Sequence, residues 1–272
     1  MRRFEAEDGT SLAYLDEGEG LPILCLAGLT RDRRDFDYLA PHLTGLRLVR
    51  LDARGRGASD WADPDTYTVQ QEAEDAVTLL DHLGIERAGI IGTSRGGLLS
   101  MWLAATAKGR LRGVCLVDIG PEIAEEGLRV IRGYVGRRPK VRTLAEAAEL
   151  RAQIMDGFED VPPERWRAEV EHFFEVREDG LHLAYDPALA GTVAASSGQP
   201  SPDLWPLFDG LGGLPLAMIR GANSDLLTPQ TFAEMRRRRP DAIAAEVPGR
   251  GHVPFLDEPE SLAAIRDWIA RL

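Results

Sequence analysis

The segment that most constrains this chain is Gly92-Thr93-Ser94-Arg95-Gly96, which directly follows the apolar run at residues 88–91. A serine between two glycines at the end of a buried strand is the pattern of a nucleophile elbow. In such an elbow a sharp turn from strand to helix exposes the serine Oγ, and the glycines leave room for the close backbone approach. The pattern therefore predicts a strand, a tight turn at Ser94 and a helix that begins at Arg95.

Two residues downstream can complete a nucleophilic site around Ser94. Asp225 follows an apolar strand-like run at 214–219, and His252 lies in a loop marked by Gly251 and Pro254. Of the five histidines, only His252 follows a strand near the C-terminus. Imidazole titrates near neutral pH, so it can take a serine proton and later return it to a leaving group.

Short apolar runs alternate with amphipathic stretches along most of the chain. Strands are expected near residues 23–26, 46–51, 88–91 and 114–117, with helices at 35–43, 68–83 and 95–107 between them. These runs are continuously apolar, which is typical of parallel strands covered by helices on both faces. An antiparallel pair at about 2–7 and 11–17 precedes them, joined across Asp8-Gly9-Thr10.

The alternation stops after residue 117 and returns at residue 214. Between them the sequence predicts two helices, at 144–157 and 163–177, and a Gly-, Ser- and Pro-rich linker at 191–202. We therefore expect one core domain made of residues 1–120 and 206–272, with a helical cap at 121–205 inserted after the sixth strand. A strand at 242–247 and helices at 229–238 and 258–271 would complete the core.

Together these motifs resemble the α/β-hydrolase family over nearly the whole chain. The resemblance rests on four segments: Gly92-x-Ser94-x-Gly96, the loop at 52–59, Gly221-Ala222-Asn223-Ser224-Asp225, and Gly251-His252-Val253-Pro254. It implies an eight-stranded, mostly parallel sheet flanked by helices. It also implies that Ser94 is the nucleophile, His252 the general base and Asp225 the acid that orients the imidazole. Some members of the fold place the acid one strand earlier, which makes Asp118 the alternative.

The family likeness also implies an oxyanion hole of two backbone N–H groups. One belongs to Arg95, and the other comes from the loop after the strand at 22–27, at Leu29. The usual His-Gly of this loop is replaced here by Ala27-Gly28. A histidine that commonly braces the loop is therefore missing, although the donor itself is a backbone group.

Four side chains are candidates for binding the substrate. Arg95 either faces the pocket and holds a substrate carboxylate, or turns away and pairs with an acid of the cap. Arg31 belongs to the run Thr30-Arg31-Asp32-Arg33-Arg34, which either adds to such a site or is a solvated charge run. Trp166 and Phe173 lie in the expected cap and, with other aromatic residues including Phe158, Phe174 and Trp205, indicate a partly apolar chamber.

The composition limits the kinds of partner, compartment and cofactor that are expected for this protein. The formal net charge of −12 disfavours nucleic acid and anionic membranes. The first residues are too charged for a secretory leader and no apolar run approaches a membrane span, which favours a cytoplasmic protein. The two cysteines, Cys25 and Cys115, lie in separate apolar runs and are expected to be reduced. No His/Cys cluster has metal-ligand spacing, so neither a metal nor another cofactor is expected.

The sequence thus favours a serine hydrolase that cleaves a small carboxylic ester or lactone through an acyl-enzyme. Two alternatives stay open at this point. One is hydrolysis of a carbon–carbon bond in a diketone or vinylogous acid, for which a pocket-facing Arg95 would suit the substrate. The other is a ligand-binding receptor that keeps the hydrolase scaffold without turnover.

Overall fold

The computed structural model describes residues 1–155, 157–194 and 202–272, and its central element is an eight-stranded sheet. The strand order is β1-β2-β4-β3-β5-β6-β9-β10. β2 pairs antiparallel with β1 and β4, and the remaining neighbours are parallel. The strands are β1 (Arg2–Glu5), β2 (Ser11–Glu17), β3 (Leu21–Leu26), β4 (Leu46–Leu51), β5 (Ala88–Thr93), β6 (Leu111–Val117), β9 (Leu216–Gly221) and β10 (Ile243–Val247). The predicted fold class, including the N-terminal antiparallel pair, is confirmed.

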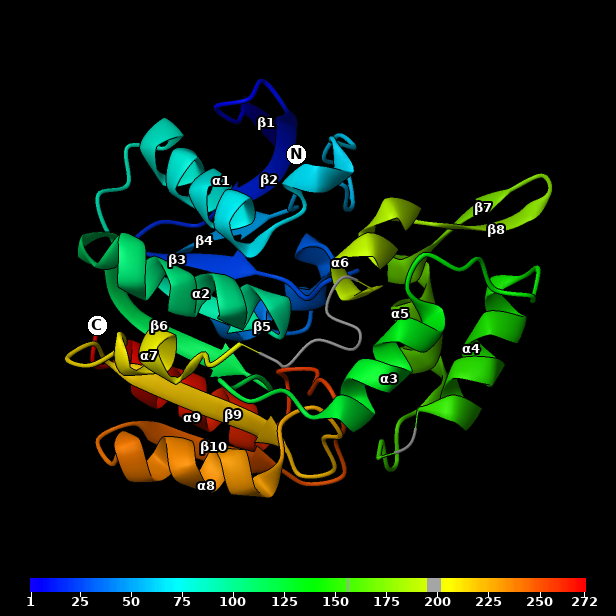
Figure 1. The fold of residues 1–272 in the computed structure, drawn as a ribbon. Helices are drawn as coiled ribbons and strands as arrows, with labels where there is room; N and C mark the ends of the chain where they lie inside the picture. Colours follow the sequence, from blue (N-terminus) through cyan, green and yellow to red (C-terminus); the bar gives the residue numbers. More distant parts are fainter. Residues whose placement is uncertain (156, 195–201) are drawn as a thin grey trace.

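Helices cover both faces of this sheet (Figure 1). Alternate residues of β3 show the two faces, since Leu24 and Leu26 belong to one buried cluster and Ile23 and Cys25 to another. The first cluster contains side chains of α1, α2, α7 and α8, and the second contains side chains of α9. These helices are α1 (Val69–His82), α2 (Arg95–Thr106), α7 (Trp205–Asp209), α8 (Pro229–Arg238) and α9 (Pro259–Ile269).

The described part of the chain between β6 and α7 lies at the carboxyl end of the parallel strands (Figure 1). It forms α3 (Glu125–Tyr134), α4 (Leu144–Ile154), α5 (Pro163–Phe173), the antiparallel strands β7 (Phe174–Arg177) and β8 (Gly180–Leu183), and α6 (Ala190–Ala194). The helices expected at 144–157 and 163–177 are present but shorter. The second ends at Phe173 because the chain continues into β7, a hairpin that the sequence pattern did not predict.

The helix expected at 35–43 needs correction, and the linker expected at 191–202 lies mostly outside the described residues. The helix expected at 35–43 is instead two short 3₁₀ helices, Arg33–Phe36 and Ala40–His42. Pro41 explains this, because proline lacks an N–H and disfavours the α conformation in the residue before it. Most of the linker expected at 191–202 lies outside the described residues, although residues 191–194 belong to α6.

Cys25 and Cys115 are free and buried, on strands β3 and β6, which β5 separates. Burial raises the pKa of Cys25 to about 12, so its thiol is protonated at neutral pH. Within the described ranges, none of the helices has the length and apolar character needed to cross a membrane.

Candidate active site

Ser94 lies at the sharp turn between β5 and α2. Its backbone has φ 51° and ψ −114°, a conformation that L-residues rarely adopt. The turn is possible because the residues two positions before and two positions after Ser94 are glycines. A Cβ on Gly92 would lie 2.4 Å from the carbonyl oxygen of Gly96, and one on Gly96 would lie 2.0 Å from that of Leu26. The elbow predicted from the sequence is therefore present.

A chain of hydrogen bonds runs from Ser94 through His252 to Asp118. His252 Nε2 lies 2.9 Å from Ser94 Oγ, and His252 Nδ1 lies 2.7 Å from Asp118 Oδ2. An ionised carboxylate can only accept, so Nδ1 carries the hydrogen. The lone pair of Nε2 is then left to accept the hydrogen bond of the serine hydroxyl. This is the geometry that a general base needs toward its nucleophile.

The carboxylate beside His252 is that of Asp118, and the expectation of Asp225 is corrected. Asp118 follows β6, the strand next to β5, and is fully buried. Gly221 N–H donates to its Oδ1 at 2.8 Å, and Ser224 Oγ donates to its Oδ2 at 2.6 Å. The last residue of β9 and the loop after it therefore supply donors that hold the acid, not the acid itself. Asp225 lines a large cavity, where its carboxylate accepts no hydrogen bond from the described residues.

The two backbone groups expected to form the oxyanion hole lie next to Ser94. Arg95 is the first residue of α2, and Leu29 lies in the loop after β3, which lines the same small cavity as Ser94. A Cβ built on the neighbouring Gly28 would lie 3.7 Å from Ser94 Cβ, so the loop packs directly against the serine. Neither amide N–H donates to a backbone or side-chain acceptor in the described part of the chain, so both remain available to a ligand.

Glu72 connects the two segments that carry these amides, and sequence reasoning missed it. Arg56 donates to the carbonyl of Leu29 at 2.8 Å and to Glu72 Oε1 at 2.8 Å. Arg95 donates to Glu72 Oε2 at 2.7 Å and to the carbonyl of Tyr67 at 2.9 Å. Arg56 thus braces the loop from which the usual histidine is absent.

The Arg95 side chain is committed to Glu72, a residue of α1 in the core, and not to an acid of the cap. Burial raises the pKa of Glu72, while the guanidiniums of Arg56 and Arg95 lower it, and the net shift is downward. Glu72 is therefore ionised, and its charge balances the buried arginines. A signal existed in the sequence: Arg54 and Arg56 in a buried loop require acids, and α1 supplies Glu72 and Asp75.

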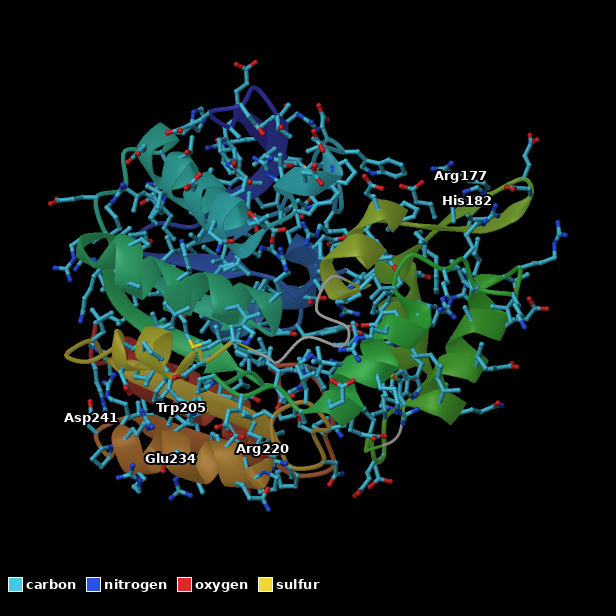
Figure 2. All side chains as sticks on the ribbon, in the orientation of Figure 1. Arg177, His182, Trp205, Arg220, Glu234 and Asp241 are labelled. Carbon is cyan, nitrogen blue, oxygen red and sulfur yellow. The ribbon has the colours of Figure 1, made fainter. Side chains whose placement is uncertain are left out.

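Two cavities adjoin His252. The smaller one, of about 80 Å³, contains Ser94 and is also lined by the aromatic residues Phe158, Trp166 and Phe173. The larger one, of about 840 Å³, lies among α3, α4 and α5 and includes Phe173 and Phe174. Trp205, expected in the chamber, instead packs edge-on against Phe208, and Arg238 Cζ lies 4.1 Å from the centroid of its ring. Figure 2 labels Trp205 close to Glu234 of α8.

Arg31 lines the smaller cavity, but its charge is compensated. Its guanidinium pairs with Asp35 and donates to Glu169 Oε2 at 2.9 Å. Its Cζ lies 4.2 Å from the centroid of the Phe173 ring. Arg31 is therefore an ion-paired wall of the site and not a solvated residue of a charge run.

No cluster of three or more His, Cys, Asp or Glu suited to a metal ion occurs among the residues that the structure describes. His182 on the β7–β8 hairpin (Figure 2) makes only a two-residue contact of this kind, because its Nε2 lies 2.7 Å from Asp179 Oδ1 and no third such group in the described residues joins them.

Comparison with known proteins identifies relatives over almost the full chain. The chain is 37% identical to a 3-hydroxybutyrate-oligomer hydrolase from Cupriavidus necator over 253 residues, which cover 89% of this chain and 85% of the relative. It is 28% identical to a 2-(acetamidomethylene)succinate hydrolase from Mesorhizobium japonicum, covering 95% of this chain and 91% of that protein.

The structural comparison agrees. An alpha/beta hydrolase from Novosphingobium aromaticivorans superposes with a TM-score of 0.92 at 41% sequence identity, over 100% of this chain and 98% of that one. The model of the alpha/beta hydrolase family matches residues 23–265. This match agrees with the elbow and the sheet described above. The chain belongs to the alpha/beta hydrolase family.

Proposed function

We propose that this protein is a serine hydrolase that cleaves small carboxylic esters through an acyl-enzyme. The observation that carries the proposal is the hydrogen-bond chain Ser94 Oγ–His252 Nε2–Asp118 Oδ2, with distances of 2.9 and 2.7 Å. The chain opens on a cavity that also contains Leu29 and Gly28. A nucleophile, a base and an orienting acid are thereby aligned beside free backbone donors.

In the first half of the reaction, His252 Nε2 takes the proton of Ser94 while Oγ bonds to the ester carbonyl carbon. The N–H groups of Leu29 and Arg95 stabilise the resulting oxyanion. Asp118 stabilises the imidazolium through Nδ1–H. The tetrahedral intermediate then collapses, the ester C–O bond breaks, and the imidazolium gives its proton to the departing alkoxide.

In the second half, water replaces the alcohol. His252 takes a proton from the water while its oxygen attacks the acyl carbon, and collapse of the second intermediate returns the proton to Ser94 Oγ and releases the acid. We also propose that residues 121–205 act as a cap that covers this chemistry, since α3 and α5 line both cavities.

Ester cleavage is preferred over the carbon–carbon alternative for a structural reason. The alternative relied on Arg95 as a carboxylate clamp, and Arg95 is paired with Glu72. The name of the Cupriavidus relative, a hydrolase of 3-hydroxybutyrate oligomers, also indicates an ester between hydroxy acids as the natural linkage.

The test measures hydrolysis of p-nitrophenyl acetate and butyrate by the wild type, Ser94→Ala and the control Ser11→Ala on β2. We expect a burst of p-nitrophenol that Ser94→Ala abolishes and Ser11→Ala retains. A fluorophosphonate should phosphonylate Ser94 Oγ with loss of fluoride, so that the peptide containing Ser94 gains the mass of the reagent less HF, and His252→Gln should slow this labelling. Turnover that survives in Ser94→Ala would refute the proposal.

A further inference from the structure

Arg151 lies at the junction of the two cavities, and its guanidinium has no hydrogen-bonding partner among the residues that the structure describes. It lies on α4 and lines both the cavity that contains Ser94 and the larger one. Its Nε is buried and unpaired, and its guanidinium donates no hydrogen bond to the part of the chain that the structure describes. Its Cζ lies 4.3 Å from the centroid of the Phe173 ring, which supports the side chain without satisfying its N–H groups.

Three other arginines of these cavities differ in this respect. Arg31 is paired with Asp35 and Glu169, Arg129 with Glu126, and Arg138 with Asp179. Arg137, which lines only the larger cavity, also makes no side-chain hydrogen bond to the described residues, but it is exposed. Of the two arginines that line the cavity of Ser94, Arg31 is paired, and Arg151 is the one whose donors are left unsatisfied by the described residues.

Glu169 and Asp35 act on the Arg151 charge through space without accepting its hydrogen bonds. Leaving the N–H donors of a partly buried guanidinium unsatisfied is costly, and a ligand that accepts them removes this cost. Burial, with the nearby charge of Arg31, lowers the pKa of Arg151 to about 10. The side chain therefore still carries its positive charge at neutral pH. Its planar donors match a carboxylate in a two-pronged arrangement.

The lining of the larger cavity carries an excess of positive charge, whereas the protein as a whole is negatively charged. Its lining includes five basic residues and two acidic ones: Arg129, Arg137, Arg138, Lys140 and Arg151, against Glu126 and Asp225. The chain as a whole has a net charge of −12. A cationic pocket in an anionic protein selects and concentrates an anionic ligand at one place.

We propose that Arg151 binds a carboxylate of the substrate, so that the esters cleaved at Ser94 are those that carry a free carboxylate. This rests on the proposed function for the reaction itself. A monoanion fits better than a phosphate dianion, because Asp35 and Glu169 place two carboxylates beside Arg31 at the inner wall. The proposal makes Arg151 a specificity residue that holds the part of the ester that does not react.

The test separates binding from turnover by using the Ser94→Ala protein. Monomethyl glutarate and dimethyl glutarate have the same chain and differ in one negative charge, and their Kd values are measured by ligand-observed NMR titration. We expect Ser94→Ala to prefer the monoanion by about tenfold or more. Adding Arg151→Gln should reduce this preference below about threefold, while Arg151→Lys should keep part of it because the charge remains.

Arg167→Gln in the same Ser94→Ala background is the matched control, because Arg167 lies on α5, pairs with Glu171 and lines neither cavity. It should leave the preference unchanged. Thermal melts followed by circular dichroism check the fold of each variant, and Arg151→Lys tests the proposal even if Arg151→Gln is unstable. A missing preference in Ser94→Ala, or one that Arg151→Gln leaves intact, would overturn the proposal.

Hydrolysis is measured separately, with mono-p-nitrophenyl glutarate against p-nitrophenyl butyrate in proteins that retain Ser94. If the carboxylate preference in binding holds but neither ester is hydrolysed, the carboxylate site stands and the proposed reaction falls. If both esters are hydrolysed with a ratio of kcat/KM that Arg151→Gln does not change, the reaction stands and the carboxylate site falls.

Discussion

Ser224 donates a hydrogen bond from its Oγ to Asp118 Oδ2 at 2.6 Å, on the same oxygen that faces His252. The two residues come from neighbouring strands, since Ser224 follows β9 and Asp118 follows β6. The acid is thus held by the loop that carries Asp225. From the sequence, either Asp118 or Asp225 can be the acid that orients His252. In the structure Asp118 is hydrogen-bonded to His252, whereas Asp225 lines the larger cavity.

The first prediction concerns these two aspartates. Asp118→Asn should reduce kcat for p-nitrophenyl butyrate by about 10³- to 10⁴-fold, because the amide neither fixes the imidazole tautomer nor stabilises imidazolium. Asp225→Asn should stay within about threefold, since Asp225 makes no contact with His252 that orients it. Steady-state kinetics of both variants decide the assignment, and the reverse ranking would restore Asp225 as the acid.

The second prediction is that Ser224→Ala weakens catalysis without abolishing it. Asp118 would keep the bond from Gly221 N–H but lose a charge-assisted donor, which contributes about 1.5–3 kcal/mol. We expect kcat to fall by about tenfold with KM little changed. Asn223→Ala, one residue earlier on the same loop, serves as the control and should keep kcat. Equal loss in both variants would mean that the loop's shape, not the hydroxyl, matters.

The third prediction concerns Glu72. Glu72→Ala would leave Arg56 and Arg95 without their buried counter-charge, which typically destabilises a protein by about 3–5 kcal/mol. Glu74→Ala, an exposed position on the same helix, should change the free energy of unfolding by less than about 0.5 kcal/mol. Urea unfolding measures both. A Glu72→Ala protein as stable as Glu74→Ala would show that the network contributes nothing to the fold.

The fourth prediction tests the close packing at the elbow. Gly96→Ala places a methyl group 2.0 Å from the carbonyl oxygen of Leu26, which the rigid strand cannot relieve. We expect a loss of about 3 kcal/mol or more, or failure to fold. Gly109→Ala meets nothing within 4 Å and should fold normally. Thermal denaturation of the two proteins gives the comparison, and a normal melting temperature for Gly96→Ala would contradict the packing described.

Sequence reasoning reached the sheet, the elbow and the histidine because each has a local signature. Ser94 lies between glycines that only a tight turn requires, and His252 lies in a Gly- and Pro-marked loop. The choice between Asp118 and Asp225 has no such signature, because both follow apolar strands. It depends on strand order, which brings β6 beside β5.

The substrate side of the site was harder to predict for a related reason. Arg95 and Arg31 stand out in the sequence because they adjoin recognisable motifs. In the structure Arg95 is paired with Glu72, and Arg31 is paired with Asp35 and Glu169. Arg151 lies on α4, far along the chain from Ser94, and has no local pattern that marks it. What distinguishes it is the lack of a partner in the described structure, which only three-dimensional packing reveals.

The position of Asp118 at the end of β6 also affects how the chain can vary. Of the three residues proposed to form the triad, Ser94 and Asp118 precede residues 121–205 and His252 follows them. The inserted segment therefore contains none of them, and its replacement would exchange the walls of the chamber while leaving the proposed reactive groups in place. Under these proposals, Arg151, which selects the substrate, lies on the inserted segment, and the three reacting residues lie outside it.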